Sequence, residues 1–252
     1  MDGPRRVRRA ELLANRMSRE QSGVAHRRQL YELGVTRSEL RAQLDARRWR
    51  SHGRQTIGLH TGPLAGRAMY FRAVFETAGD SALDGVSALI DAGLVGFRED
   101  LVHVSVAKST IHRRPRGVRV HETRRRYDGD AGIVRGLPRV DLAAAAIRAA
   151  LWAESGRQAS LILIMSVQQQ IVTPGALHEA FSRVLRDRRR GLIKAVLSDL
   201  ADGVRSMGEL DFARMCRRRG LPTPSRQQWR RLPDGRACLD VYFDQYGVVV
   251  EI

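Results

Sequence analysis

The sequence predicts a chain of the α+β class, and three observations carry that prediction. The first is its size and composition: 252 residues, 43% hydrophobic and 28% charged, suit two or three globular domains and exclude disorder over most of the length. The second is a pair of short amphipathic helices followed by a strand pair near the N-terminus. The third is a C-terminal stretch in which one helix precedes three strands separated by turns.

The charge of the chain is strongly positive. Forty-four basic residues stand against 27 acidic ones, which gives a formal net charge of +17, and only Lys108 and Lys194 are lysines. A GC-rich genome would explain the preference for arginine over lysine, but it does not explain the shortage of acids. A surplus of this size favours a polyanionic partner, and nucleic acid is the first candidate.

Several classes of protein are excluded at this stage. Cys216 and Cys238 lie 22 positions apart, a spacing that suggests neither a zinc site nor a disulfide scaffold. The longest apolar run, residues 161–165, is far shorter than the ~20 residues that a membrane span needs, so no membrane partner is expected. The charged start lacks the apolar stretch of a secretory signal. We therefore expect a cytoplasmic protein in a reducing compartment.

Four segments can be distinguished along the chain. Residues 1–17 read as a basic arm, residues 18–60 as short helices with a strand pair, residues 61–200 as a helix-rich middle region with a small antiparallel sheet, and residues 201–252 as a helix followed by strands. No internal repeat is visible, and no short motif of a serine hydrolase, a zinc protease or a phosphate-binding loop occurs.

The second segment has the layout of a helix-turn-helix. Residues 26–33 predict one helix, Gly34 and Val35 a turn, and a second helix runs to about residue 47. Thr36 is expected to cap the second helix, because Glu39 follows three residues later and completes a capping box. In this layout the first residues of the second helix reach base edges. The residues predicted to contact DNA there are Arg37, Ser38 and Arg41.

A basic hairpin is predicted directly after the second helix. Residues 48–50 and 55–59 read as two strands around the turn 51–54, and such a wing would bring Arg48, Arg50 and Arg54 to DNA. The alternative is a helix pair whose arginines are solvated and whose surface serves protein contacts.

The order Gly-Val, Leu, Leu-Gly-Val-Thr, Arg-Trp-Arg and Gly in this segment resembles the winged-helix domain of the AbiEi family of antitoxins. Gln55-Thr56-Ile57 stand where that family usually has Gly-Val-Tyr. The resemblance implies a transcriptional regulator of a toxin–antitoxin operon, with double-stranded DNA and a cognate toxin as partners.

The middle region is expected to be mainly structural. Helices are predicted over residues 66–78 and 81–89, strands over 102–106 and 118–121 as an antiparallel pair, and further helices end at Trp152 and begin after Thr173. The loop between the two strands carries four basic residues, which either follow a phosphate backbone or form a solvated charged loop. These residues are Lys108, Arg113, Arg114 and Arg116.

The C-terminal segment carries three candidate catalytic carboxylates. Asp240 and Glu251 are predicted on facing positions of two adjacent strands, where two carboxylates would need a cation between them. Magnesium held by this pair would polarise a phosphate and activate water, and Glu209 on the preceding helix would add a third acid ligand or orient a water. Plain solvent-facing charge is the alternative.

The order Ser-x-x-Glu, Gly-Leu-Pro-x-Pro, Asp-Gly-Arg, Leu-Asp-Val and Val-Val-Glu-Ile over residues 203–252 resembles the Vsr-like domain of the PD-(D/E)xK nucleases, which have the restriction-endonuclease fold. By this resemblance Asp240 and Glu251 are the metal ligands. The family continues with Asp-Gly and a histidine, so we expect an incomplete domain and no DNA cleavage by these 252 residues. Three hypotheses follow: a DNA-binding regulator, a magnesium-dependent DNA endonuclease of which the chain is a fragment, and an inactive remnant.

Overall fold

A computed structural model describes residues 12–17, 19–77, 80–123, 131–201, 207–222, 225–232, 235–243 and 245–250. The chain folds as two compact units, an N-terminal unit of residues 1–91 and 98–141 and a C-terminal unit of residues 92–97 and 142–252. Helices and small sheets occur in both, which confirms the α+β class. The small sheet of the middle region belongs to the unit that contains residues 18–60.

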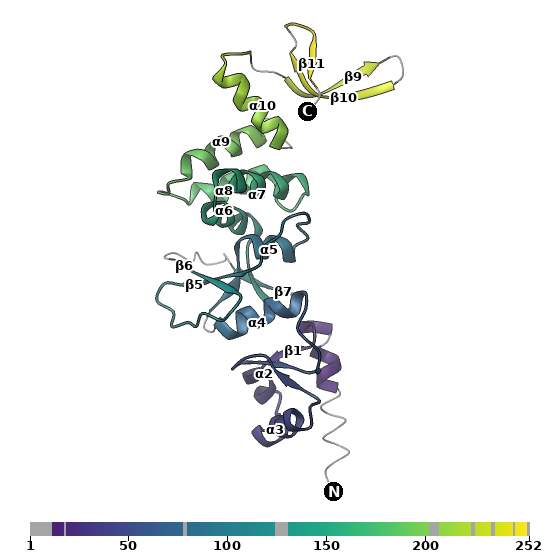
Figure 1. Cartoon of the computed structure of the whole chain (residues 1–252), viewed down its shortest axis with the longest axis vertical. Helices are drawn as coiled ribbons and strands as arrows, with labels where there is room; N and C mark the ends of the chain where they lie inside the picture. Colours follow the sequence, from purple (N-terminus) through teal and green to yellow (C-terminus); the bar gives the residue numbers. More distant parts are fainter. Residues whose placement is uncertain are drawn as a thin grey trace. The chain divides into compact units, whose positions relative to one another are not determined.

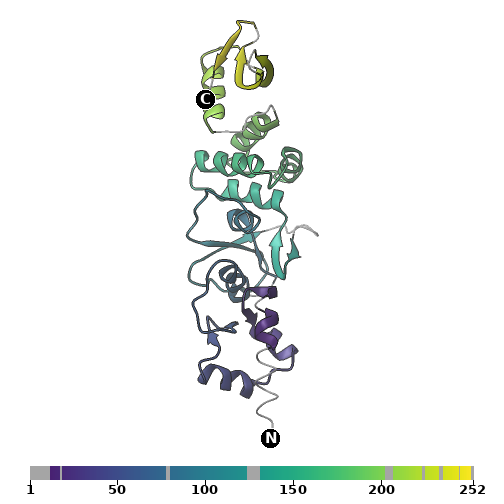
Figure 2. The same ribbon diagram turned by 90° about the vertical axis from the view of Figure 1, so that its right-hand side faces the viewer.

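The first part of the N-terminal unit, here called the N-terminal module, spans residues 12–60 and is purple to dark blue in Figures 1 and 2. Its core contains Leu30, Leu40, Trp49 and Ile57. Residues 12–17 and 19–21 are helical and add the buried Met17 to that core, so part of the expected arm belongs to the module. The elements are β1 (Val24–His26), α2 (Arg27–Glu32), α3 (Arg37–Asp45), β2 (Arg50–Ser51) and β3 (Thr56–Gly58), with strand order β1-β3-β2.

The second part of the N-terminal unit is a five-stranded sheet with two helices. The strand order is β6-β5-β4-β8-β7. The sheet is mixed, because β5 pairs with β6 and β4 with β8 in parallel, whereas β4–β5 and β7–β8 are antiparallel. The elements are α4 (Arg67–Thr77), β4 (Ala82–Leu83), α5 (Gly85–Asp91), β5 (Val102–Ala107), β6 (Val118–Thr123), β7 (Ala131–Val134) and β8 (Leu137–Val140).

The prediction that residues 102–106 and 118–121 form an antiparallel pair is therefore wrong. Val102 pairs with Val118 and Ala107 with Thr123, so the two strands run in the same direction. Residues 108–117 are long enough to bring the chain back along the six-residue strand β5, since ten extended residues span up to ~33 Å. The predicted helix over residues 81–89 likewise begins only at Gly85, after the buried two-residue strand β4.

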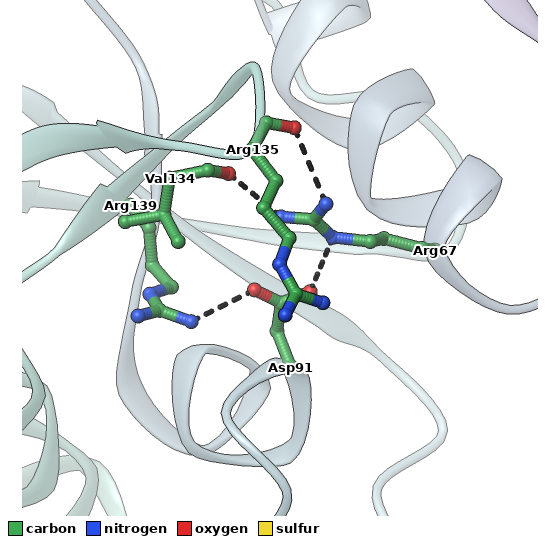
Figure 3. Close-up of polar contacts among 5 residues, drawn as sticks. All are labelled: Arg67, Asp91, Val134, Arg135 and Arg139. Carbon is green, nitrogen blue, oxygen red and sulfur yellow. Dashed lines mark hydrogen bonds and ion pairs between the residues drawn. The ribbon is translucent and has the colours of Figure 1, made fainter. Parts of the chain in front are cut away.

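A buried ion-pair network joins the elements of the sheet region (Figure 3). The Asp91 carboxylate at the end of α5 accepts from Arg67 Nε at 2.8 Å and from Arg139 Nη1 at 2.9 Å. Arg67 also donates to the carbonyl oxygens of Val134 at 2.7 Å and Arg135 at 3.2 Å. Because the Asp91 side chain is only 4% exposed, both guanidinium groups are needed to compensate its desolvation. The network therefore has a structural role.

The C-terminal unit contains a helical layer and a small sheet. Helices α6 to α9, green in Figure 1, pack on one another. Thr173 caps α8 and Pro174 is its first residue, as predicted. The sheet is antiparallel with strand order β11-β10-β9. The elements are α6 (Leu142–Trp152), α7 (Gly156–Gln168), α8 (Pro174–Ser182), α9 (Arg190–Ala201), α10 (Met207–Arg218), β9 (Ser225–Leu232), β10 (Gly235–Phe243) and β11 (Val248–Val250).

Candidate nucleic-acid interface

Helix α3 presents one polar face to solvent. Arg37, Ser38 and Arg41 are exposed, whereas Leu40 and Gln43 on the opposite face are buried. Arg41 lies one turn from both Arg37 and Ser38, because positions three and four apart are neighbours on a helix of 3.6 residues per turn. The side chains that the sequence predicts at the DNA surface thus point away from the core of the module.

The capping box predicted at the start of α3 is present. Thr36 Oγ1 accepts from the Glu39 backbone N–H at 3.2 Å, and the Glu39 carboxylate accepts from the Thr36 backbone N–H at 2.7 Å. This reciprocal pair satisfies two amides that would otherwise lack a partner at the helix start. It also fixes where α3 begins, and hence which side chains occupy its first turn. Helix α2 has a second capping box, formed by His26 and Gln29, which the sequence interpretation missed.

The predicted hairpin follows α3. Strands β2 and β3 are antiparallel, with Arg50 opposite Gly58 and Ser51 opposite Ile57. Trp49, just before β2, is 5% exposed and anchors the hairpin in the core. The side chains of Arg48, Arg50 and Arg54 are exposed. Arg48 Nε donates to Gln43 Oε1 at 2.7 Å, which holds that arginine beside the end of α3.

Positive charge converges on the hairpin from its own residues and from helix α4. The pKa of His52 is lowered by burial and then by the nearby charges of Arg50, His60 and Arg72, the last of which lies on α4. Residues 12–60 carry ten arginines and four acids. Acids of this surface are paired at i,i+4 spacing: Glu32 accepts from Arg28 Nε at 2.7 Å, and Asp45 lies 3.9 Å from Arg41. The field at the surface is consequently positive.

The basic loop between β5 and β6 lies beside the hairpin. A single guanidinium joins them, since Arg72 Nε donates to His52 O at 2.9 Å and Arg72 Nη1 donates to Arg116 O at 3.3 Å. The Arg113 backbone N–H donates to Thr77 O at the end of α4 at 2.9 Å. The backbone of the loop at Arg116 is thereby held next to that of the hairpin, and the loop carries four exposed basic side chains. They are Lys108, Arg113, Arg114 and Arg116.

The candidate nuclease residues are only partly within the described structure. Glu209 is 8% exposed in the first turn of α10. Asp240 lies on β10, next to Val241, which pairs with Val250 of β11; the structure does not describe the Asp240 side chain. Glu251 lies outside the described residues. Among the described side chains no group of three or more His, Cys, Asp or Glu gathers as a metal site would require, and the magnesium site stays a prediction.

Comparisons with known proteins add no family. A scan against protein-family models finds no match, and a search of curated proteins finds none either. Within the described part of the chain, no helix combines the length and the apolar character that crossing a membrane requires.

Proposed function

We propose that this protein binds double-stranded DNA through α3 and the β2–β3 hairpin, in the manner of a winged helix-turn-helix. In this arrangement the start of α3 enters the major groove and the hairpin contacts the backbone alongside. Support comes from the arrangement of six polar residues, all exposed on elements whose apolar side chains form one core. These residues are Arg37, Ser38, Arg41, Arg48, Arg50 and Arg54.

We assign different roles to these residues. Arg37 is in the first turn of α3, where a guanidinium can form a bidentate contact with guanine in the major groove. Arg54 lies in the hairpin loop, where it contacts phosphate and carries no sequence information. The loop 108–117 beside the hairpin extends the phosphate contacts. Binding of this type suits a transcriptional regulator, with a toxin as the second partner by the resemblance to AbiEi-like antitoxins.

The roles are tested by selecting preferred duplexes from a random pool and then measuring affinities of variants. Arg37→Ala should weaken binding to the selected duplex by about 1–3 kcal/mol and relax the preference at one base position. Arg54→Ala should weaken binding to selected and random duplexes by the same factor. Arg157→Ala is the matched control, because this exposed arginine belongs to the C-terminal unit and pairs with Asp211 at 2.9 Å. An Arg37 variant with the wild-type affinity and preference would remove α3 from the interface.

A further inference from the structure

The loop of the hairpin, residues 52–55, is held by a single carboxylate from outside the module. Glu76 of α4 accepts three consecutive backbone N–H groups, those of Arg54 at 2.9 Å, Gln55 at 2.8 Å and Thr56 at 2.7 Å. The Thr56 hydroxyl donates a fourth hydrogen bond at 2.8 Å to the same carboxylate. Glu76 is 6% exposed, so these four donors replace its hydration shell.

The carboxylate is ionised at neutral pH. Burial by itself would raise the pKa of Glu76, but the hydrogen bonds from Thr56, Gln55 and Arg54 lower it below its ordinary value. The negative charge is therefore present in the folded protein, close to a surface that we assign to DNA. Hydrogen bonds from charged or polar groups to an ionised acceptor are the strong ones, so this contact holds the loop firmly.

Gly53 leaves the space that the carboxylate fills. A Cβ atom at this position would lie 2.3 Å from Cδ of Glu76, which is far inside van der Waals contact. The carbonyl groups of the loop are held as well: Arg72 Nε donates to His52 O, and Arg27 Nε donates to Arg54 O at 3.1 Å. The backbone of the loop is thus fixed by donors and acceptors, while the Arg54 side chain stays exposed.

We propose that Glu76 is a positioning residue for DNA binding, whose carboxylate fixes the hairpin loop so that Arg54 meets a phosphate without an ordering cost. This inference rests on the proposed function. Fixing a loop before binding strengthens association, because less conformational freedom is lost in the complex. Electrostatics alone gives the opposite expectation: removing a negative charge near DNA should tighten binding. The direction of the effect of a neutral variant therefore distinguishes the two roles.

Glu76→Gln is the informative variant, because it keeps the shape and removes the charge. One side-chain oxygen still accepts from Gln55 and Thr56, but the amide NH₂ then faces the Arg54 N–H, and two donors repel. Glu32→Gln is the matched control, since it removes an equal charge from an exposed ion pair on α2, in the module that carries the hairpin. We expect Glu32→Gln to bind duplex DNA as the wild type does or slightly more tightly.

The experiment measures duplex affinity for the wild type, Arg54→Ala, Glu76→Gln and the double variant. We expect Arg54→Ala and Glu76→Gln each to weaken binding about tenfold, the size of one charge-assisted hydrogen bond. The double variant should be no weaker than Glu76→Gln alone. Two results would overturn the positioning role and leave the proposed function intact. In the first, Glu76→Gln binds duplex as tightly as the wild type. In the second, Arg54→Ala weakens binding about tenfold even in the Glu76→Gln background. A wild type that does not bind duplex overturns both.

Amide hydrogen exchange provides a readout without DNA. In the wild type the amides of Arg54, Gln55 and Thr56 should be protected, and in Glu76→Gln the Arg54 amide should exchange faster while those of α3 keep their protection. Exchange of all three at exposed-loop rates in the wild type would contradict the inference. If Glu76→Gln does not fold, Thr56→Val removes one of the four donors, and we expect the same direction with a smaller effect.

Discussion

At the scale of single residues, the buried His103 and the half-buried His121 face each other across the parallel strands β5 and β6. His121 Nε2 lies 3.2 Å from His103 Nδ1, so one ring donates and the other accepts when both are neutral. Burial lowers the pKa of His121 to about 3, with further contributions from His103 and Arg119. Burial also lowers the pKa of His103, against the opposing charges of Glu99 and Asp84. Protonation of this pair therefore opposes folding.

The pair predicts a loss of stability in mild acid. Both histidines have a lower pKa in the folded chain than the ordinary value of 6.5, so the unfolded chain binds more protons below that pH. The free energy of unfolding should fall as the pH drops below 6.5, and the contribution of His121 should continue to fall toward pH 3, by at most about 1.4 kcal/mol per pH unit. Urea unfolding at several pH values measures this slope. His121→Gln should flatten it, and an equal slope in that variant would contradict the assignment.

At the scale of elements, the start of α3 depends on a local signal. Thr36→Ala removes the hydroxyl that accepts from the Glu39 amide and donates to the Glu39 carboxylate at 2.8 Å. We expect a loss of about 1 kcal/mol in the free energy of unfolding, because one end of the helix then lacks its cap. Thr36→Ser keeps the hydroxyl and should be nearly neutral. Denaturant unfolding of both variants checks this; equal losses would mean that the hydroxyl is not what matters.

The elements that sequence predicts well are those with local signals. Thr36 and Glu39 are three residues apart, and β2 and β3 are joined by a four-residue loop, so helix start and hairpin are visible in the sequence. The direction of β6 is not visible in the sequence, because it depends on the path of residues 108–117. Helix α4 guides that path through the hydrogen bond from the Arg113 backbone N–H to Thr77 O. The role of Glu76 is equally hidden, since its partners lie 20 to 22 positions away.

Of the candidate site, the exposed residues of α3 and the hairpin could be predicted because they sit beside a recognisable capping box and a basic turn. The residues that hold this surface from behind could not be predicted. Arg72 and Glu76 lie on a helix of mixed apolar and charged residues, and only the folded arrangement shows that both turn toward the hairpin loop. Contacts made by backbone groups leave no side-chain pattern in the sequence.

At the scale of the whole molecule, DNA binding caused by the net charge of +17 must be distinguished from DNA binding by a specific surface. A generally basic chain attracts DNA through many scattered arginines, whereas the proposed interface uses a defined set. Arg41, Arg48, Arg50 and Arg54 are exposed on adjacent elements of one module, and we expect most of the phosphate contacts from these four. Removing an arginine outside the interface and outside the loop 108–117, such as Arg157, should then leave the salt dependence unchanged.

The most direct test of duplex binding is its salt dependence, measured by fluorescence anisotropy from about 50 mM salt upward. Four phosphate contacts predict a slope of log K against log salt of about −3.6, at about 0.9 per contact. Arg54→Ala should make the slope shallower by about 0.9, and Arg157→Ala should leave it unchanged. No duplex binding at ~50 mM salt, or a slope that Arg54→Ala and Arg157→Ala change equally, would contradict the assignment of α3 and the hairpin as the DNA-binding surface.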